Sequence, residues 1–600
     1  MRISFRFPHT LSSNATRQHR RRSLLYACAL IAVLPLAWRG VSCGHDFDFH
    51  LQSWLEAAQH WREGVLYPHW DASANYGAGE PRFVFYPPVT WMLGALLGTL
   101  LPWNWVPIAF TLLAFIACGL SFYKMACEWM PEDAAGVAAC IYLLNPYLLF
   151  VAYERTAYGE LLSAALLPLL VLYGLRKQPS LLPLSLVIVA LWLTNAPSAV
   201  MGCYFLALIV LVGAVCQKMT GTPSGPASIH LIFRATGALL LGLALAAFYI
   251  VPAYYEQRWV EIARAIAPGM RIEDSFLFEH TGAIYHDQVL RTASWIAVAM
   301  LAATAIAAWF SGRTAHLRSG LEDHNSWTIF RIPMVTTAIV ILLLLLPFSD
   351  PLWQHLPELK FLQFTWRWLL VLGMVMPALI GLALRGSFRE ATTRRSILIR
   401  AVTLLALAAT ASFFTARFFW LPCDEEDNIA AQRATLLNGG FEGTDEYTAA
   451  KSDNGDIQQD LPQVRVVNAP DADEADSSVA ENPEWKLNTK QSVPAEIKLS
   501  LWQTEKKAIE VTTSAPAYAL LRLVDYPAWQ ITINGRTITT RPHRDDGLMV
   551  IPLPSGHSVI AIHYAATPDV KIGRAISLLA LCIVLVLYAR TKKRQNLQVS

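Results

Sequence analysis

The chain has 600 residues, of which 54% are hydrophobic and 16% charged, with a mean hydropathy of +0.36. Soluble domains carry about 25% charged residues, so the composition argues against a soluble enzyme and predicts a polytopic membrane protein. Residues 420–570 hold 23 Asp and Glu against 12 Lys and Arg, which leaves the hydrophobic remainder basic. The nine cysteines show no CxxC or zinc-ligand spacing, and no feature indicates binding of nucleic acid.

Residues 1–23 form a basic, cytoplasmic N-terminus, and residues 24–43 form a first transmembrane helix. Because positive residues stay in the cytoplasm, we expect this helix to run outward and to place the loop 44–104 outside the cytoplasm. A cleaved signal peptide is the alternative reading, although Trp38 and Arg39 fit a cleavage region poorly.

Eleven further apolar segments predict the remaining spans, ten of them within a membrane domain of residues 105–418. They are residues 105–123, 134–152, 160–175, 180–196, 198–216, 233–251, 291–311, 332–347, 366–384, 397–418 and 572–590. Residues 88–101 are expected to be re-entrant or interfacial, because the basic loops then all fall in the cytoplasm. The fold prediction is therefore about twelve transmembrane helices with both termini cytoplasmic; a crossing at 88–101 would make thirteen.

Residues 51–66 carry apolar side chains at helical spacing, with polar residues on the other face. This pattern predicts an amphipathic helix at the membrane interface, with Trp54 and Trp61 at the depth of the lipid headgroups.

The C-terminal part divides into four segments. Residues 419–483 are acidic and lack periodicity, which predicts an irregular linker. Residues 484–571 alternate between apolar and polar, and Asn534-Gly535 is typical of a tight hairpin, so we expect an extracytoplasmic β-sandwich. Residues 572–590 form the last span and residues 591–600 a cytoplasmic tail.

The loop after the first helix begins Gly44-His45-Asp46-Phe47-Asp48-Phe49-His50, so two carboxylates and two imidazoles lie at the edge of the membrane. Asp46 and Asp48 point the same way in an extended chain, whereas Asp46 and His50 share a face in a helix. The alternative is that either carboxylate caps the helix that begins near His50. Cys43 and Cys423 are both expected outside the cytoplasm, where they can pair.

Two sets of motifs carry a family resemblance. They are His45-Asp46, Tyr67-Pro68-His69-Trp70, Gly77-Ala78-Gly79 and Phe85-Tyr86-Pro87-Pro88 in the first loop, and Tyr526-Pro527-Ala528-Trp529, Asn534-Gly535-Arg536, Leu553-Pro554-Ser555-Gly556-His557 and His563-Tyr564 near the end. In combination and order, the chain resembles bacterial YfhO-like and "6-pyruvoyl-tetrahydropterin synthase-related" membrane proteins, although nothing in it resembles a pterin synthase. The resemblance implies a GT-C glycosyltransferase fold and an acidic residue in the first extracytoplasmic loop, a place that Asp46 occupies.

GT-C enzymes take sugars from polyprenyl-phosphate carriers, so the resemblance implies a base, a group that holds the leaving phosphate and a groove for the prenyl chain. Asp46 is the expected catalytic base, with Asp48 as the second catalytic candidate. Arginine grips phosphate oxygens well, and intramembrane-edge charges often mark function. The expected substrate-binding residues are His50, Glu80, Arg155, Glu160 and Arg367. For each of them a structural role as a turn, a helix end or a membrane anchor is the alternative.

The resulting hypothesis is an inverting glycosyltransferase of the bacterial inner membrane. Its partners would be membrane lipids, a polyprenyl-phosphate sugar donor and a glycan, lipid or protein acceptor. A lipid-linked glycan carrier or flippase is a second reading, but the chain shows no convincing repeat. A non-catalytic envelope assembly protein is a third. Asp46, Asp48 and His50 could hold a divalent cation, but without a third acidic ligand we assign no metal.

Overall fold

The computed structural model describes residues 9–176, 181–219, 226–316, 321–388, 394–457, 459, 461–472 and 492–599. The chain divides into two compact units. We call the first the helical unit; it consists of Met1–Phe47, Pro102–Leu243 and Pro268–Asp424. The second, the mixed unit, consists of Asp48–Leu101, Ala244–Ala267 and Glu425–Ser600.

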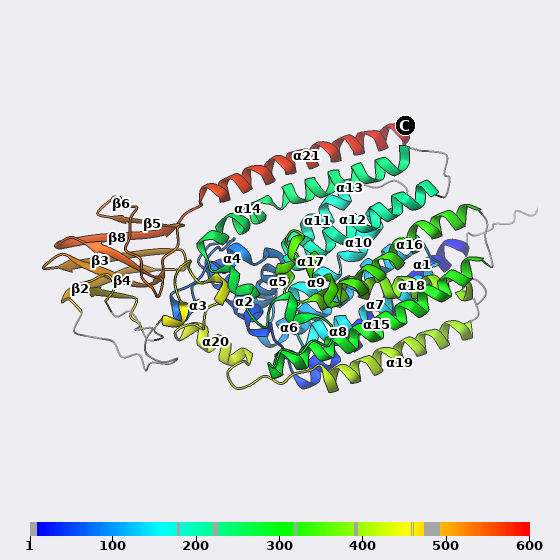
Figure 1. Cartoon of the computed structure of the whole chain (residues 1–600), viewed down its shortest axis with the longest axis horizontal. Coiled ribbons are helices and arrows are strands. Elements are labelled where there is room, and N and C mark those ends of the chain that lie inside the picture. The colour runs from blue at the N-terminus through cyan, green and yellow to red at the C-terminus, as the bar shows by residue number, and fades with distance from the viewer. Residues whose placement is uncertain are drawn as a thin grey trace, which may run out of the picture. The chain divides into compact units, whose positions relative to one another are not determined.

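The helical unit is a bundle of apolar helices (Figure 1). They are α1 (His9–Arg39), α6 (Val106–Ala126), α7 (Glu132–Leu143), α8 (Pro146–Tyr153), α9 (Tyr158–Ala164), α10 (Leu167–Leu175), α11 (Leu181–Thr194), α12 (Ala196–Met219), α13 (Pro226–Leu245), α15 (Ile284–His316), α16 (Leu321–Leu344), α17 (Asp350–His355), α18 (Leu369–Phe388) and α19 (Arg394–Phe418). Two pairs of short consecutive helices, α7–α8 and α9–α10, each make up one apolar stretch long enough to cross a bilayer.

Within the described residues, nine helical stretches are long and apolar enough to cross a membrane, or eleven if two bent pairs each count as one span. The multi-span fold is thereby confirmed. The predicted count of twelve differs because α11 has only 14 residues, which at 1.5 Å per residue extend about 21 Å. The 13-residue α5 (Pro88–Leu100) is shorter still, so the expectation that 88–101 does not cross agrees with its length. The sidedness of the termini stays a prediction.

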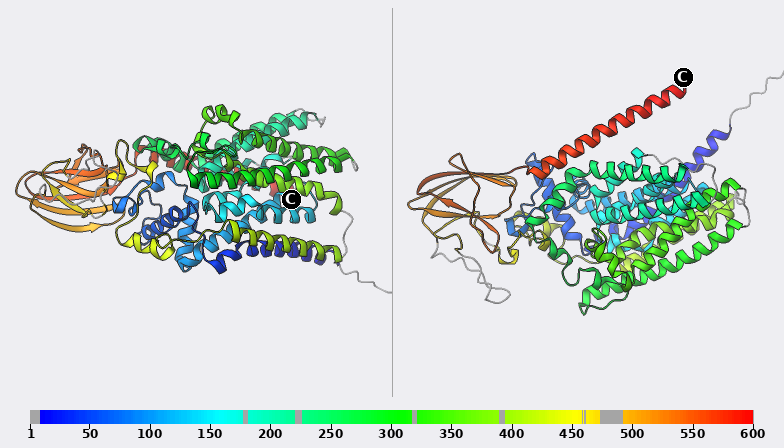
Figure 2. Two further views of the ribbon diagram at one scale, coloured as in Figure 1. Left: turned by 60° about the horizontal axis from the view of Figure 1, so that its bottom comes forward. Right: turned by 45° about the horizontal axis from the view of Figure 1, so that its top comes forward.

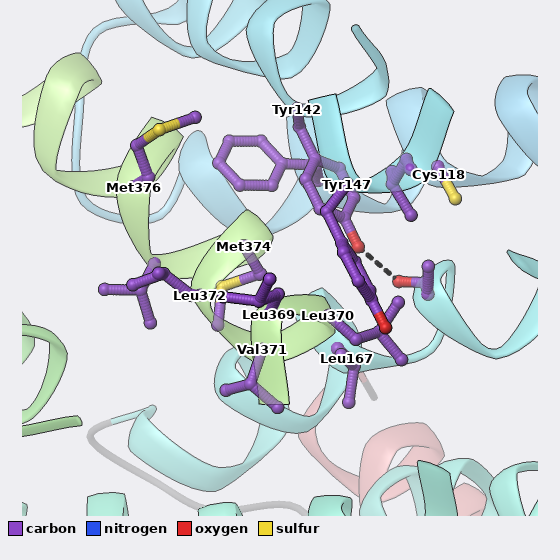
Figure 3. Packing of buried hydrophobic residues seen from close by; sticks show 14 of the residues in the cluster. Cys118, Tyr142, Tyr147, Leu167, Leu369, Leu370, Val371, Leu372, Met374 and Met376 are labelled. Atoms are coloured by element: carbon purple, nitrogen blue, oxygen red, sulfur yellow. Dashed lines mark hydrogen bonds between the residues drawn. The ribbon is translucent and has the colours of Figure 1, made fainter. Parts of the chain in front are cut away.

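The core of the helical unit is a continuous apolar cluster built from most of its helices. Figure 3 shows a part of it, in which Leu369, Leu370 and Met374 of α18 lie beside Tyr147 of α8. Helices α1 and α19 run side by side (Figure 2, left). A disulfide joins Cys43 and Cys423, directly beyond the ends of these two helices. The sequence left this pairing open as one possibility; the disulfide is present, and it ties the loop after α1 to the bundle.

The mixed unit contains the short helices of the first loop, three helices of the chain's later part and the β-domain. The helices are α2 (Phe47–Arg62), α3 (Ala74–Gly77), α4 (Arg82–Phe85), α5, α14 (Ala247–Tyr255), α20 (Ile429–Leu437) and α21 (Pro568–Val599). Helices α14 and α21 pack closely, and a Cβ on Gly573 would lie 2.5 Å from the Ala247 carbonyl oxygen.

The amphipathic pattern predicted that one face of α2 would lie toward the lipid, but the structure differs. Trp54 is fully buried, and so is most of the helix all round. The polar face is covered as well, because Gln52 donates to the Gln432 side chain at 2.8 Å and Glu56 accepts from the Ser73 hydroxyl at 2.7 Å. A polar stripe that the protein itself satisfies has the same sequence pattern as one that faces water.

The β-domain is a sandwich of two antiparallel sheets (Figures 1 and 2). One sheet has the order β1-β4-β7 and the other β2-β3-β8-β5-β6. The strands are β1 (Val464–Val467), β2 (Ala495–Trp502), β3 (Lys506–Thr513), β4 (Ala517–Val524), β5 (Trp529–Ile533), β6 (Arg536–Ile538), β7 (Leu548–Leu553) and β8 (Gly556–Tyr564). Asn534 and Gly535, at φ of 50° and 79°, make the predicted β5–β6 turn. The predicted C-terminal β-sandwich is confirmed.

The predicted irregular linker 419–483 contains regular structure in its described part. Helix α20 begins at Ile429, where Asn428 caps it by accepting from the Ala431 N–H at 2.9 Å. Strand β1 pairs with β4 and belongs to the sandwich. All four residues of β1 are buried, so the strand lacks the alternation by which the other strands were predicted.

Candidate functional site

The loop after α1 is fixed to the turn between α8 and α9 by its backbone. The His45 N–H donates to the Glu154 carbonyl at 3.3 Å, and the Asp46 N–H donates to the Arg155 carbonyl at 3.0 Å. A Cβ at Gly44 would lie 2.2 Å from the Glu154 carbonyl oxygen, so only glycine fits there. The first motif and the polar island at 153–160 are thus one local structure.

Four charged side chains of the helical unit form a continuous chain, which we call the Asp46 cluster: Asp46, Arg155, Glu160 and Arg367. The Arg155 guanidinium bridges the two carboxylates, with N–O distances of 3.3 Å to Asp46 and 2.6 Å to Glu160. The Arg367 Nε lies 3.8 Å from the same Glu160 oxygen. Formal charges within the cluster balance, two positive against two negative.

The residues of the Asp46 cluster differ in how far their side chains are exposed to solvent. The side chains of Arg155 and Glu160 are each 4% exposed, whereas that of Asp46 is 37% exposed. The Tyr147 hydroxyl donates to the other Glu160 oxygen at 2.7 Å, so this carboxylate is fully engaged. The Arg367 Nε is buried and has no hydrogen-bond partner among the described residues. A buried donor without an acceptor is costly, so Arg367 has capacity for a further anion.

The pKa values of the neighbouring groups follow from burial. Burial lowers the pKa of Arg155, but the carboxylates of Glu160 and Asp46 raise it by more, so the guanidinium stays charged. Burial, with the positive charge of Arg155, lowers the pKa of His45 against the opposing effect of Asp46. Burial also raises the pKa of Glu154 to about 7. The cluster thus lies beside a neutral imidazole and a carboxyl group that titrates near neutral pH.

The structure adds three residues to the sequence-based candidates. His45 stacks on Tyr285 with ring centroids 4.7 Å apart, and its Nε2 is buried without a hydrogen-bond partner among the described residues. Glu154 is buried rather than solvated. Tyr147 orients Glu160. His45 and Glu154 are next to predicted site residues in the chain, so their position in the sequence could have identified them. Tyr147 lies in an apolar helix, and nothing in its sequence context marks it as a site residue.

Asp48 and His50 belong to the mixed unit. Asp48 lies in the first turn of α2, and its carboxylate accepts from the Phe49 N–H at 2.9 Å, as in the alternative role at the helix end. His50 is buried, and its Nδ1 pairs with the Tyr86 hydroxyl. Their predicted catalytic and binding roles stay predictions.

Glu80 lies in a second set of charged residues, which we call the Arg82 cluster: Glu56, His60, Asp71, Glu80 and Arg82, all of them at most 1% exposed. The Arg82 Nε lies 2.7 Å from Glu80 and 3.1 Å from Asp71. Glu80 also accepts from the N–H and hydroxyl of Thr444 at 2.7 and 2.9 Å. The carboxylate of Glu80 is thereby fully occupied by protein donors.

Three further contacts hold the other members of the Arg82 cluster. Glu56 accepts from the Ala72 N–H and the Ser73 hydroxyl at 2.8 and 2.7 Å, and the His60 Nε2 lies 2.8 Å from the Trp70 carbonyl oxygen. Burial raises the pKa of Asp71 to about 8 against the effect of Arg82. Burial lowers the pKa of His60, but Glu56 raises it by more, which favours the charged imidazolium.

Within the described residues, no group of three or more His, Cys, Asp or Glu side chains is arranged to hold a metal ion. The Asp46 cluster itself contains two carboxylates, each paired with an arginine. Its chemistry is that of an accessible carboxylate beside two guanidinium groups, which suits proton abstraction from a hydroxyl together with binding of an anion.

No family model matches the chain, and no curated protein matches it. Among solved structures, the fold is similar to that of the arabinofuranosyltransferase AftD from mycobacteria. One AftD structure aligns at 16% identity and a TM-score of 0.40, over 67% of this chain and 27% of that one. A structure of an AftD mutant aligns at 12% identity and a TM-score of 0.42, over 92% and 60%. The chain therefore spans less than two thirds of the length of AftD.

Proposed function

We propose that the chain is a membrane glycosyltransferase of the GT-C type, which moves a sugar from a polyprenyl-phosphate carrier to an extracytoplasmic hydroxyl. The observation that carries this proposal is the Asp46 cluster, in which an accessible carboxylate and an arginine with an unused donor lie on either side of a neutral Arg155–Glu160 ion pair. A transfer reaction needs both functions, whereas an ion-pair network that only stabilises the fold needs neither.

In the proposed reaction Asp46 takes the proton from the acceptor hydroxyl. The acceptor oxygen forms a bond to the anomeric carbon, the bond from that carbon to the phosphate oxygen breaks, and its electron pair leaves with the polyprenyl phosphate. Attack from the face opposite the phosphate inverts the anomeric configuration. The charge that develops on the phosphate is stabilised by a preorganised guanidinium group.

The two arginines have different roles in this proposal. Arg155 is already bridged to both carboxylates, so it positions Asp46 and keeps Glu160 in place. Arg367 has the free Nε and is therefore the group that holds the leaving phosphate. This division makes Arg367 the main phosphate ligand.

The sidedness of the site is supported by two features. Disulfides persist in oxidising compartments, and the Cys43–Cys423 bridge lies three residues before Asp46. The basic loops fall on the opposite side in the predicted topology. Both features support an extracytoplasmic Asp46 loop.

A transfer assay tests the proposal. Purified protein is reconstituted with a radiolabelled polyprenyl-phosphate sugar and an acceptor extract from bacterial envelopes, and Asp46→Asn is the matched control. We expect incorporation by the native chain that falls by about 10²–10⁴ in the variant. No incorporation above a protein-free background with any of several sugar donors would remove the proposal. Equal incorporation by both proteins above that background would remove Asp46 as the base.

A further inference from the structure

A polar cavity of about 230 Å³ lies in the mixed unit, outside the Asp46 and Arg82 clusters. Its walls come from the end of α2, the first loop, the segment after α20, the β2–β3 hairpin and strand β4. The side chains that give it its character are Gln59, Gln463, Gln503, Trp502, Lys507 and Arg522. Three amides, an aromatic ring and two cations therefore converge on one hollow.

Arg522 is the first sign that the cavity takes a ligand. Its Nε is buried, and within the described part of the chain the side chain has no hydrogen-bond or ion-pair partner. The guanidinium lies over Gly77, where a Cβ would be 3.4 Å from the Nε. The side chain as a whole is partly exposed, so the cost falls on the Nε, a buried donor without an acceptor. An anion in the cavity would remove that cost.

Lys507 is an independent second sign. Its side chain is buried, and its Nζ donates to the Thr504 carbonyl at 2.6 Å and lies 4.4 Å from the centre of the Trp529 ring and 5.7 Å from that of Trp502. Glu63 also lines the cavity, but its carboxylate accepts from the Thr504 N–H and hydroxyl, and Glu505 pairs with the His69 side chain. Burial lowers the pKa of Lys507 to about 7. A nearby anion would favour its charged form.

We propose that this cavity binds a saccharide that carries an anionic group, either a carboxylate or a phosphate ester. The guanidinium of Arg522 and the ammonium of Lys507 receive the anion, the amides of Gln59, Gln463 and Gln503 bond to ring hydroxyls, and Trp502 offers an apolar face to the sugar ring. An apolar ligand would leave both cations unpaired, and a bare anion would not use the amides or the ring. This binding site does not depend on the proposed transfer reaction.

Saturation-transfer NMR on the full-length protein in detergent micelles tests the site. The probes are galacturonic acid and glucose 6-phosphate as the two anionic sugars, galactose as a neutral match and inorganic phosphate as a bare anion. We expect at least one anionic sugar to bind about tenfold more tightly than galactose and inorganic phosphate. The anionic sugar that binds more tightly identifies the anionic group, carboxylate or phosphate ester. Equal binding of galactose, equal binding of inorganic phosphate, or no binding of either anionic sugar would overturn the proposal.

Matched variants locate the binding. Arg522→Gln should weaken the anionic sugar about tenfold, and Arg522→Lys should restore part of the loss because it keeps the charge. The control is Arg536→Gln, an exposed arginine on β6 at the opposite edge of the sheet from the β2–β3 hairpin. Lys507→Met supplies a second test if Arg522→Gln lowers the thermal unfolding midpoint. Unchanged binding in folded Arg522→Gln and Lys507→Met proteins would place the sugar elsewhere and refute the site.

The Asp46→Asn protein separates this inference from the proposed reaction. Because Asp46 lies in the helical unit and the cavity in the mixed unit, the variant should bind the anionic sugar as the native chain does. If the native chain binds the anionic sugar but shows no transfer activity, the saccharide site is supported and the transferase proposal fails. If it shows transfer activity but no binding, the transferase proposal is supported and the saccharide site fails.

Discussion

The Asp46 cluster and the Arg82 cluster contain the same kinds of groups and use them differently. In the Arg82 cluster every carboxylate is at most 1% exposed, and Glu56 and Glu80 each accept from backbone and hydroxyl donors. In the Asp46 cluster the Asp46 side chain is 37% exposed, and the Arg367 Nε lies 3.8 Å from Glu160 without a hydrogen-bond partner among the described residues. The Arg82 cluster also has one such atom, the Asp71 Oδ2, but it is closed to solvent and lies 3.1 Å from the Arg82 Nε. The difference that leaves capacity for a ligand is therefore the exposed carboxylate of the Asp46 cluster.

The largest expected effect is the loss of the cation at the centre of the Arg82 cluster. Arg82→Met leaves the buried Glu80 carboxylate without its counter-charge and Asp71 without its contact to the guanidinium, so we expect the free energy of unfolding to fall by about 3–5 kcal/mol. Thermal and denaturant unfolding in detergent measure it. The control, Arg62→Met at the exposed end of α2, should change little, and a similar loss in both variants would show that the Arg82 cluster has no special structural role.

The disulfide gives the next largest effect, on the segment that holds the Asp46 cluster. Removing it by Cys43→Ser and Cys423→Ser should cost about 2–4 kcal/mol and should lower transfer activity, because Asp46 follows Cys43 by three residues. Thermal unfolding, transfer assays and mass spectrometry of linked peptides check both points. Cys582→Ser, an exposed free cysteine, is the control; alkylation of Cys43 and Cys423 in the native, unreduced protein would contradict the bridge.

Arg367→Gln tests the open end of the Asp46 cluster. Loss of a charged hydrogen-bond donor to phosphate costs about 1.5–3 kcal/mol, so we expect the KM for the lipid-linked donor to rise roughly ten- to a hundredfold. The thermal unfolding midpoint should change little, because the Nε has no hydrogen bond to lose among the described residues and its ion pair with Glu160 is long, at 3.8 Å.

Two variants sharpen the result for Arg367. Arg367→Lys should recover only part of the affinity, since lysine lacks the planar fork of arginine. Arg417→Gln, exposed near the end of α19, is the neutral control. A fall in stability without a change in KM would assign Arg367 a purely structural role.

The sequence predicts these two clusters to different degrees. Asp46, Arg155, Glu160 and Arg367 were all candidates because polar residues at the ends of apolar helices are conspicuous. Their pairing was out of reach, since Arg155 lies 109 residues from Asp46 in the chain. The same limit applies to Glu80, whose partner Thr444 is 364 residues away, so nothing local distinguished it from a substrate ligand.

The fold was predictable wherever a periodic pattern and burial agree. Long apolar runs gave the spans, and Asn534-Gly535 gave the β5–β6 hairpin. The interpretation of α2 was wrong because its polar face is satisfied by other parts of the mixed unit. Strand β1 was missed because all four of its residues are buried, which removes the alternation that marks a half-buried strand.

The smallest expected effects are on the pH dependence of stability. Burial raises the pKa of Glu154 from 4.5 to about 7 and that of Asp71 from 3.8 to about 8. The folded protein therefore holds more protons than the unfolded chain within these windows, so each group's contribution to stability is present below the lower value and is lost as the pH rises to the upper one.

Neutral replacements isolate each contribution to the pH dependence. Glu154→Gln should reduce the change of the unfolding midpoint with pH between about pH 4.5 and 7. Asp71→Asn should reduce that change between about pH 3.8 and 8. Unfolding midpoints across this range measure both. A midpoint that rises with pH more steeply in the native chain than in either variant would have the wrong sign for buried carboxyl groups.

The most direct measurement compares Asp46→Asn with Glu80→Gln, one carboxylate from each cluster, for transfer activity and thermal unfolding in the same preparation. The account predicts that Asp46→Asn keeps its unfolding midpoint and loses transfer by about 10²–10⁴, while Glu80→Gln unfolds at a clearly lower temperature and any folded fraction keeps its activity. If Asp46→Asn unfolds early and Glu80→Gln is stable but inactive, the roles of the two clusters are reversed and the account is wrong.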